Sequence, residues 1–434
     1  MTASPPSWSS AGAAAPRTVT EHAAAVASLV AATASERVPL SEASGRVLAQ
    51  DLASVVALPP FDNSAMDGYA VRAAEVAGAS EAAPVRLPVG ADIPAGRTDV
   101  PPLGPGTAHR IMTGAPVPEG ADAIVPVERT DAGTETVAIG APAAVGAHVR
   151  LAGEDAAAGQ VLLRAGTVLA APQIGLAAAC GSATLAVRRR PHVLVLSTGS
   201  ELVAPGRPLE PGQIYESNGT MLAVAVREAG ATAEQLSFVP DDVETFRAVL
   251  AEKAVAGVDL VLTSGGVSAG AYEVVKDALT GNGVEFGKVA MQPGGPQGAG
   301  RLRLGGAGVE GGGVEAADVE TSGVAVVTLP GNPVSSLVSF EVFVRPALRA
   351  AMGHPNPGRP VVTARLDGSL GSPTGRRQFR RGILDARAGT VAEIGTPASH
   401  LIGALARADC LIDLPAEVER VGDGDPVDVW LLEG

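Results

Sequence analysis

The stretch Ser264-Gly-Gly-Val-Ser-Ala-Gly270 decides the fold that we expect for this chain. An apolar, β-branched run over residues 258–263 precedes it and predicts a buried strand, and the apolar spacing over residues 272–280 predicts a helix that ends at Gly281. Glycines allow backbone N–H groups to converge on an anion, and the helix N-terminus adds positive charge. The stretch is therefore either a phosphate-binding loop or a tight turn without a ligand.

Two more glycine-containing loops follow predicted strands nearby, Leu196-Ser-Thr-Gly-Ser-Glu201 and Leu329-Pro-Gly-Asn-Pro-Val-Ser335. Each is predicted to link a strand to a helix. Ligands of open α/β sheets bind beyond the carboxyl ends of the strands, so the three loops can line one cleft. None of them has the spacing of a P-loop or of GxGxxG, which argues against an ordinary nucleotide-triphosphate or dinucleotide fold.

The pattern of predicted strands and helices differs between the region around these loops and the regions before and after it. Alternating predicted strands and helices indicate an open, mostly parallel α/β sheet, and short strands separated by Pro and Gly indicate all-β regions before and after it. We therefore expect a multidomain α/β chain with a disordered tail (1–17), a discontinuous helical and mixed linking domain (18–57 and 149–187), a β-rich insert (58–148), the α/β domain (188–354) and a small C-terminal β-barrel (355–434).

Three segments carry more specific expectations. Apolar spacing predicts a helix from Thr18, the uncharged run over 169–187 predicts a buried helix over 172–180 followed by a strand, and residues 298–323 predict a mobile loop or extended hairpin. A membrane span over 169–187 is the less favoured alternative, because the run contains proline, glycine and polar residues.

Composition restricts the class of protein. A net charge of −14 argues against nucleic acid or an anionic membrane as a partner. Cys180 and Cys410 are too few for a disulfide framework or a cysteine metal site, so a reduced, cytosolic protein is expected. The Ser/Ala/Pro-rich start of the chain lacks the basic and apolar regions of a signal peptide.

Carboxylates accompany the predicted loops: Glu201 ends the first loop, Glu273 follows the second, and Asp242 follows a predicted strand. Such oxygen ligands beside a phosphate suit Mg²⁺, which commonly takes one or two carboxylates together with phosphates. For each of them the alternative is a helix N-cap.

Two polar stretches are unusual for loops. Pro60-Phe-Asp-Asn-Ser-Ala-Met-Asp-Gly-Tyr-Ala-Val71 places four polar residues between apolar ones, and Arg110-Ile-Met-Thr-Gly-Ala-Pro-Val-Pro-Glu-Gly120 follows a predicted strand. A simple turn explains neither composition, although a buried hydrogen-bonded corner could.

Taken together, these stretches resemble the molybdopterin molybdotransferase (MoeA-like, gephyrin E-domain-like) family. The shared stretches follow the family's order across nearly the whole chain from Thr18: Phe61–Ala70, Arg110–Gly120, Gly153–Asp155, Ser197–Glu201, Ser264–Gly270 and Leu329–Pro333. The resemblance implies a cytosolic homodimer with an elongated four-domain subunit. It also implies an enzyme that uses Mg²⁺ to insert molybdate into adenylyl-molybdopterin, which an upstream molybdopterin adenylyltransferase supplies, and that releases AMP.

The resemblance also implies roles for individual residues. The residues implied in catalysis are Asp67, Thr113, Asp155, Asp242 and Lys288, of which Asp67 and Thr113 would come from the insert of the partner subunit. Those implied in substrate binding are Ser197, Thr198, Gly199, Glu201, Ser264, Gly265, Gly266, Ser268, Pro330, Gly331, Asn332, Pro333, Arg381 and Ser399. The implied Mg²⁺ ligands are Asp242, Glu201 and Glu273.

The chain departs from the family pattern after Lys288. Gln292 and Gly295 stand where many family members have lysines, which leaves open whether molybdate binding or activity is weakened, and Arg301 or Arg303 could supply the missing charge. The alternative function is therefore a non-catalytic protein that binds or carries molybdopterin. A scaffold role is disfavoured, because nothing resembles the extra domain and linker of scaffolding relatives.

Overall fold

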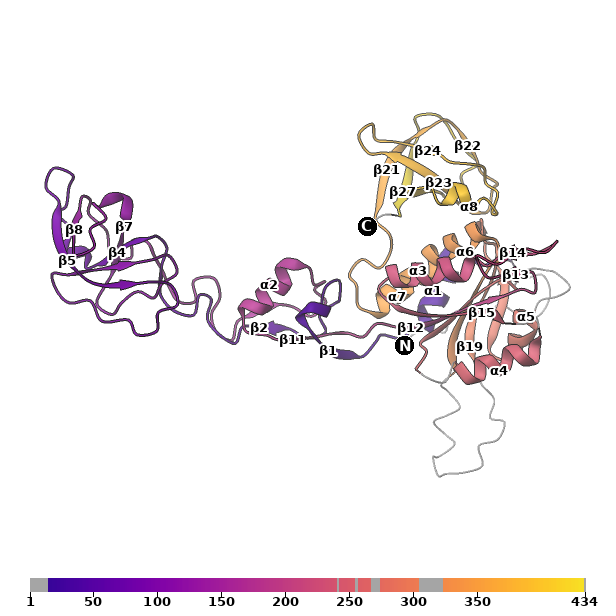
Figure 1. Cartoon of the computed structure of the whole chain (residues 1–434). Helices are drawn as coiled ribbons and strands as arrows, with labels where there is room; N and C mark the ends of the chain where they lie inside the picture. Colours follow the sequence, from indigo (N-terminus) through magenta and orange to yellow (C-terminus); the bar gives the residue numbers. More distant parts are fainter. Residues whose placement is uncertain (1–14, 240–241, 254–256, 267–273, 304–322, 433–434) are drawn as a thin grey trace, which may run out of the picture. The chain divides into compact units, whose positions relative to one another are not determined.

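The computed structural model describes residues 15–239, 242–253, 257–266, 274–303 and 323–432 (Figure 1). The chain divides into two compact units. The larger unit consists of Met1–Glu36 and Arg188–Gly434, and the smaller unit is Arg37–Val187.

A six-stranded mixed sheet forms the centre of the larger unit. Its strands, in spatial order, are β15 (Thr232–Val239), β12 (His192–Thr198), β16 (Leu260–Ser264), β20 (Val324–Leu329), β19 (Pro296–Leu302) and β17 (Val284–Lys288). The first four are parallel, whereas β19 runs antiparallel to both of its neighbours. Every residue of β16 is buried, as expected for a strand with helices on both faces. The predicted mostly parallel α/β sheet is confirmed.

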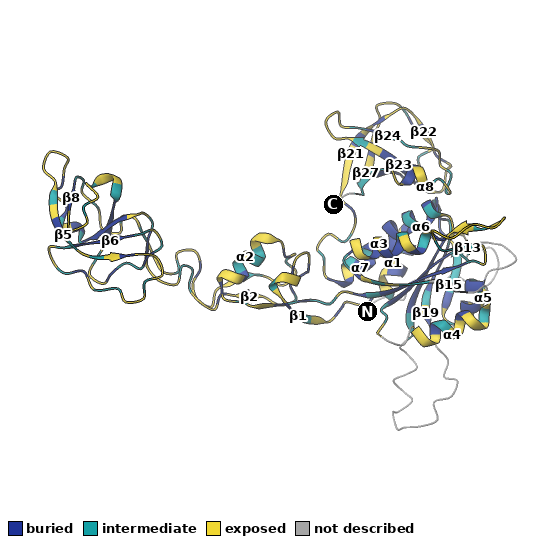
Figure 2. Ribbon diagram, in the orientation of Figure 1, coloured by how far each residue is buried: buried dark blue, intermediate teal, exposed yellow. Residues whose placement is uncertain are grey.

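Helices cover both faces of this sheet (Figure 1). They are α3 (Asn218–Glu228), α4 (Val243–Lys253), α5 (Val274–Leu279), α6 (Pro333–Ser339), the π-helical turn η4 (Phe340–Val344) and α7 (Arg345–Ala351). Two apolar clusters result, one that includes Leu222, Val338 and Phe343 on one face and one that includes Phe246 and Leu279 on the other. In Figure 2 the buried residues lie between these layers.

The N-terminal helix α1 (Val19–Leu29) packs in a place that the sequence did not indicate. A capping box starts it, because the Thr18 hydroxyl accepts from the Glu21 N–H while the Glu21 carboxylate accepts from the Thr18 N–H. We predicted this helix as part of the linking domain, but Val19 and Val26 belong to the apolar core of the α/β sheet. The predicted tail also ends earlier, since Arg17 is buried and pairs with β17 through its N–H and the Lys288 carbonyl. The tail residues before Ala15 lie outside the described residues.

His22, on the buried face of α1, makes the stability of the larger unit depend on pH. Its ring packs edge-on against Phe343 at 4.7 Å, and burial, followed by the charge of Arg17, lowers the pKa of His22 to about 3. His22 therefore becomes protonated below pH 6.5 in the unfolded chain, but only below about pH 3 in the folded chain. We expect the free energy of unfolding to fall by roughly 2 kcal/mol between pH 7 and pH 5 from this residue. Urea unfolding should show a flatter pH slope for His22→Gln, and equal slopes for both proteins would contradict the assignment.

A closed five-stranded barrel forms the C-terminal part of the larger unit, as predicted. Its strands are β21 (Val361–Asp367), β23 (Arg377–Asp385), β24 (Thr390–Glu393), β25 (Cys410–Leu414) and β27 (Pro426–Leu431), with β22 (Leu370–Gly371) and β26 (Arg420–Val421) as a short extra pair and α8 (Ile402–Leu405) before β25. A short strand of the α/β domain, β18 (Met291–Gln292), pairs in parallel with the start of β23. The Arg377 N–H also donates to the Ala290 carbonyl at 3.0 Å.

A buried ion cluster connects the helical layer to the segment that leads into the barrel. Arg359 donates two hydrogen bonds to the Glu341 carboxylate, from Nε at 2.8 Å and from Nη2 at 3.1 Å. Arg345 lies 3.8 Å from the same carboxylate, and all three side chains are at most 5% exposed. Burial lowers the pKa of Arg345, because it disfavours the charged form of the guanidinium.

The smaller unit contains a β-rich part with its own core. Its five-stranded sheet has the order β7 (Ala123–Pro126), β4 (Gly68–Val71), β6 (Ala108–Ile111), β5 (Val85–Ile93) and β8 (Thr136–Ile139). Tyr69 is fully buried in this core and its hydroxyl donates to the Gly133 carbonyl. Short 3₁₀ turns, η2 (Ala73–Glu75) and η3 (Val127–Arg129), and the pair β3 (Asn63–Ser64) with β9 (Val149–Arg150) complete this part.

A second small core in this unit gathers residues from two distant segments, among them Leu48 and Leu185. Its elements are β1 (Ser35–Pro39), η1 (Leu40–Glu42), β2 (Leu52–Ala53), β10 (Val161–Leu163), α2 (Ala171–Ala179) and β11 (Thr184–Arg188). The helix and strand expected over 169–187 are present, but the helix is not buried as predicted, because Ala177 is its single buried residue. Among the helices that the structure describes, none has the length and apolarity needed to cross a membrane.

Candidate functional site

The three glycine-containing loops begin at the same edge of the central sheet, at the carboxyl ends of neighbouring strands. Ser197 at the end of β12 pairs with Ser264 at the end of β16, and Ser264 pairs with Leu329 at the end of β20. Because these strands are parallel neighbours, the loops that follow them begin side by side. The structure therefore brings together the three segments that the sequence predicted to line one cleft.

The second and third loops touch each other. The Gly265 N–H donates to the Leu329 carbonyl at 3.1 Å, and a Cβ on Gly331 would lie 3.4 Å from the Gly265 Cα. Gly265 and Gly266 have φ values of +95° and +67°, where a side chain is strained. A Cβ on Gly266 would also meet the Val275 side chain at 2.8 Å. Ser268, which we predicted in this loop, lies outside the described residues.

Asn218, which the sequence analysis did not single out, bridges these two loops. Its side-chain Nδ2 donates to the Ser264 hydroxyl at 2.9 Å and to the Gly331 carbonyl at 2.6 Å. The contacts span 46 and 113 residues of chain, so no local pattern could reveal them. The one available signal was an asparagine at the first position of a predicted helix beside the loops.

The first loop has a different continuation from the one we predicted. Ser197 and Thr198 are buried, whereas Glu201 is exposed. After Gly199 the chain forms the paired strands β13 (Leu202–Val203) and β14 (Ile214–Tyr215) before α3 begins. The expected direct passage from loop to helix is wrong here, because residues 200–217, which include this parallel strand pair, lie between Gly199 and the helix. Glu216, directly after β14, is buried and accepts from the Ser197 hydroxyl at 3.0 Å.

The third loop reaches the barrel. Asn332 donates from its side-chain nitrogen to the Ser399 hydroxyl at 2.8 Å, and the Val334 N–H donates to the Ser399 carbonyl at 3.1 Å. Pro330 is buried, and Pro333 occupies the start of α6, where a missing N–H costs nothing. Two predicted substrate residues, Asn332 and Ser399, are thus in direct contact although they belong to different domains.

Arg381 lies behind Ser399 and does not face open solvent. It is 3% exposed, and its guanidinium donates to the Ala398 carbonyl at 3.1 Å and to the Thr396 carbonyl. Burial, followed by the charge of Arg380, lowers the pKa of Arg381. In this arrangement Arg381 holds the loop that carries Ser399 in place.

Lys288 ends β17, and its position follows from the sheet topology. Because β19 is antiparallel to both β20 and β17, the last two run in the same direction, and the exposed Lys288 lies at the same edge of the sheet as the three loops. Gln292 lies beside Gln378 in the β18–β23 pair. A Cβ at Gly295 would meet only the Val289 and Met291 carbonyl oxygens, at 3.7 and 3.9 Å, so this position has room for a side chain.

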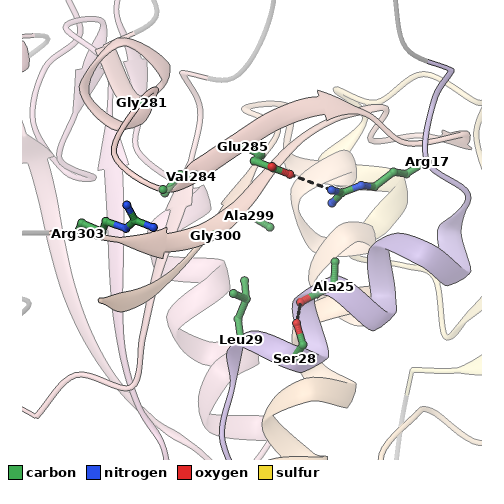
Figure 3. Close-up of a pocket in the computed structure, with 11 residues that line it drawn as sticks. Arg17, Ala25, Ser28, Leu29, Gly281, Val284, Glu285, Ala299, Gly300 and Arg303 are labelled. Atoms are coloured by element: carbon green, nitrogen blue, oxygen red, sulfur yellow. Dashed lines mark hydrogen bonds and ion pairs between the residues drawn. The ribbon is translucent and has the colours of Figure 1, made fainter. Parts of the chain in front are cut away.

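The two arginines proposed to replace the missing lysines are directed elsewhere. Arg301 donates to the Leu29 and Gly323 carbonyl oxygens at 2.8 and 3.1 Å. Arg303 lines a cavity of about 540 Å³ between α1 and the start of β17, at the edge of the sheet opposite to Lys288, where Arg17 and Glu285 form an ion pair of 2.9 Å (Figure 3). That expectation is therefore wrong for Arg301, and Arg303 lines a different cavity.

The carboxylates predicted to bind Mg²⁺ are only partly described. Asp242 caps α4, because one of its oxygens accepts from the Thr245 N–H and hydroxyl, both at 2.7 Å. These bonds lower the pKa of Asp242. Glu201 and Asp242 each follow by three residues the paired positions Thr198 and Val239 of neighbouring strands. Within the described parts of the chain, no group of three or more His, Cys, Asp or Glu side chains forms a metal site, and Glu273 lies outside those parts.

In the smaller unit the two unusual polar stretches form one hydrogen-bonded corner. The Gly114 N–H donates to the Ser64 carbonyl, and the Ser64 N–H to the Ala115 carbonyl. At the surface of this corner an oxygen of Asp67 accepts from the N–H and the hydroxyl of Thr113, both at 2.7 Å. These bonds lower the pKa of Asp67, which is therefore an exposed, ionised carboxylate at neutral pH. The exposed Asp155 lies on a separate turn, where its N–H donates to the Leu58 carbonyl.

Comparison with known proteins places this geometry among molybdopterin proteins. Three family descriptions match successive parts of the chain: the MoeA N-terminal region (domain I and II) over residues 17–181, a probable molybdopterin binding domain over 194–350, and the MoeA C-terminal region (domain IV) over 363–432.

Similar whole chains are also known. The chain is 54% identical to molybdopterin molybdenumtransferase 2 of Mycobacterium tuberculosis, over 96% of this chain and 100% of that protein. It is 37% identical to the molybdopterin molybdenumtransferase of Synechococcus elongatus, over 92% and 94% of the two chains. The crystal structure of a molybdopterin biosynthesis MoeA protein from Pyrococcus horikoshii is similar with a TM-score of 0.80 at 32% identity, over 97% of this chain and 100% of that one.

Proposed function

This chain belongs to the MoeA family of molybdopterin molybdenumtransferases, and on that premise we propose that it inserts molybdate into adenylyl-molybdopterin and releases AMP, a step of molybdenum cofactor biosynthesis. The observation that carries the proposal is the contact between Asn332 and Ser399 at 2.8 Å. It joins a loop of the molybdopterin-binding domain to the barrel, so that one ligand can touch both.

The described residues suit the charges of these substrates. The pyrophosphate that links molybdopterin to AMP is an anion that glycine loops can hold through backbone N–H groups, and Gly266 of the second loop and Gly331 of the third loop would supply such groups. Molybdate is a dianion. Ser399 and Lys288 supply a hydroxyl donor and a cation at the same edge of the sheet, and Arg381 keeps the Ser399 loop in place.

Mg²⁺ would be held by few protein ligands. The exposed Glu201 and Asp242 follow neighbouring strands, and among the described contacts the helix cap uses one oxygen of Asp242; Glu273 follows the second loop in the sequence. One to three carboxylates suit Mg²⁺, which completes its coordination shell with substrate phosphates and water. When bound, Mg²⁺ would neutralise the pyrophosphate that links molybdopterin to AMP and polarise it for cleavage.

We further propose that the working enzyme is a cytoplasmic homodimer in which Asp67 and Thr113 of each subunit complete the site of the other. What supports this is the chemistry of the pair: an exposed, ionised carboxylate held by two hydrogen bonds is fixed in position yet available to a ligand. Asp155, exposed in the same unit, would act beside it. The substrate would come from an upstream molybdopterin adenylyltransferase.

The decisive experiment supplies the purified protein with adenylyl-molybdopterin, molybdate and Mg²⁺ and measures AMP by chromatography. We expect AMP release that requires both the metal and the oxyanion. If no AMP is released at all molybdate concentrations tested, the proposed reaction is refuted.

A second candidate, a molybdopterin carrier without turnover, is favoured by one observation: Gln292 and Gly295 provide no charge where the family pattern has lysines. It predicts tight molybdopterin binding, no AMP release and partial recovery of release in Gly295→Lys. That variant should fold, because a side chain at Gly295 meets only ordinary contacts. Full AMP release by the unaltered protein would exclude the carrier.

A further inference from the structure

Asn218 joins two walls of the cleft through a single side chain. Its Nδ2 donates to the Ser264 hydroxyl of the second loop and to the Gly331 carbonyl of the third. A carbonyl oxygen can only accept, so the 2.6 Å contact with Gly331 fixes which end of the carboxamide faces the loops. The opposite atom, Oδ1, is buried and accepts no hydrogen bond from the residues that the structure describes. The functional atom of Asn218 is therefore its donor nitrogen.

A second buried group fixes the position from which Asn218 acts. Glu216 is 3% exposed, and its carboxylate accepts from the Ser197 hydroxyl at 3.0 Å and from the Gly219 N–H at 2.6 Å. It also accepts from Gln235 Nε2 at 3.2 Å. These bonds connect the first turn of α3 to the end of β12 and to the middle of β15.

The first turn of α3 is packed too closely for a side chain at Gly219. A Cβ on Gly219 would lie 2.5 Å from the Ser197 hydroxyl oxygen and 3.0 Å from Gln235 Nε2. The start of α3 is consequently held against the end of β12. From this fixed position the Asn218 side chain reaches the second and third loops. One short segment, residues 216–219, thus makes contact with all three loop-bearing strand ends.

We propose that Asn218 is a positioning residue for the pterin substrate: it fixes the separation of the second and third loops, and Glu216 holds it in place. This inference rests on the proposed function, because those loops are the ones expected to hold the pterin phosphate. An anion cradle works only while its backbone donors converge on one point. Hydrogen bonds to a charged phosphate are stronger than neutral ones, so loss of their alignment with the bridge should be visible in substrate affinity.

The experiment compares Asn218→Ala and Asn218→Asp with the unaltered protein. Molybdopterin binding is followed by pterin fluorescence, and KM and kcat by AMP release. We expect Asn218→Ala to raise the dissociation constant and KM by about 10–100-fold with a smaller change in kcat, the effect of losing a hydrogen bond to a charged group. Asn218→Asp should be at least as damaging, because it places a carboxylate oxygen 2.6 Å from the Gly331 carbonyl oxygen. Near-normal affinity of the Asp variant would overturn the donor role.

Matched variants separate positioning from general loss of structure. Asn282→Ala removes another asparagine of the same domain whose Nδ2 donates to a backbone carbonyl, that of Ala278 at 3.0 Å, away from the loops; its KM should stay normal. Glu216→Gln should raise KM in the same direction as Asn218→Ala but by less, since an amide oxygen can still accept. Equal KM for Asn218→Ala and the unaltered protein would refute the inference.

A readout without substrate separates this inference from the proposed function. Hydrogen exchange at the amides of residues 264–266 and 329–332 should quicken several-fold in Asn218→Ala but not in Asn282→Ala. If the unaltered protein neither binds molybdopterin nor releases AMP, the proposed function fails while this measurement still tests the bridge. Unchanged exchange in Asn218→Ala would show that the loops keep their separation without it.

Discussion

Replacement of Asp67 by asparagine is expected to leave the fold intact and to reduce AMP release by about 10²–10⁴-fold. One oxygen of Asp67 accepts from the N–H and the hydroxyl of Thr113, and these bonds keep the pKa of the carboxyl below its ordinary value. An asparagine oxygen can accept the same two bonds and the side chain has the same volume. The substitution therefore removes a charge and little else.

A neighbouring carboxylate provides the control for this variant. Asp62 is also exposed and accepts from the Ala152 N–H at 2.7 Å within the same corner. Asp62→Asn should release AMP at the rate of the unaltered protein, and both variants should unfold at the same urea concentration as that protein. Normal AMP release by Asp67→Asn would assign Asp67 to the architecture of the corner.

Replacement of Glu341 by glutamine is expected to lower the free energy of unfolding of the larger unit by about 3–5 kcal/mol. Glu341 is the carboxylate that Arg359 holds through two hydrogen bonds and that lies 3.8 Å from Arg345. Without it, two nearly fully buried guanidinium groups would remain opposite a neutral amide. An uncompensated buried charge costs far more than the pair contributes, so this substitution should exceed any surface change in its effect.

Urea unfolding followed by circular dichroism and Trp430 fluorescence measures this loss. Glu252→Gln is the matched control in the same unit, because it breaks the exposed Lys253–Glu252 pair of 3.1 Å and should change stability by roughly 0.5 kcal/mol or less. The double variant Glu341→Leu/Arg359→Met should be more stable than Glu341→Gln, since it removes a charge together with its partner. A loss below about 1 kcal/mol in Glu341→Gln would contradict a buried, charge-compensating role.

The sequence predicted the parts of the site that depend on local pattern. The apolar runs that end at Ser197, Ser264 and Leu329 are read from a few residues each, and parallel pairing then places the loops after them at one edge. The barrel was likewise visible in its short strands and turns. Asp242 shows the limit of such reading, because a carboxylate before a helix predicts both a cap and a metal ligand, and the structure shows the cap.

Features that depend on long-range packing were missed. The amphipathic stripe of α1 indicates a buried face without saying which core it joins, and Val26 packs against the sheet more than 150 residues later. Glu216 and Asn218 carry no motif of their own; their importance comes from partners in other segments. The parallel strand pair after Gly199 went unpredicted because its strands are two residues long, too short for alternation to show.

The pairing of β18 with β23 changes how the boundary before the barrel should be understood. Residues 291–292 supply backbone hydrogen bonds and packing to a strand that the chain reaches some 85 residues later, and the Asn332–Ser399 bond adds a second attachment. A protease that cut the Pro/Gly-rich connection at residues 355–358 would therefore produce two fragments that remain associated. Expressed without the rest, the barrel would instead leave residues 377–378 at the start of β23 without their β18 neighbour, a place at which strands of other molecules can add. The peptide bond between these two parts is thus one of several attachments, and the barrel is not an independent module.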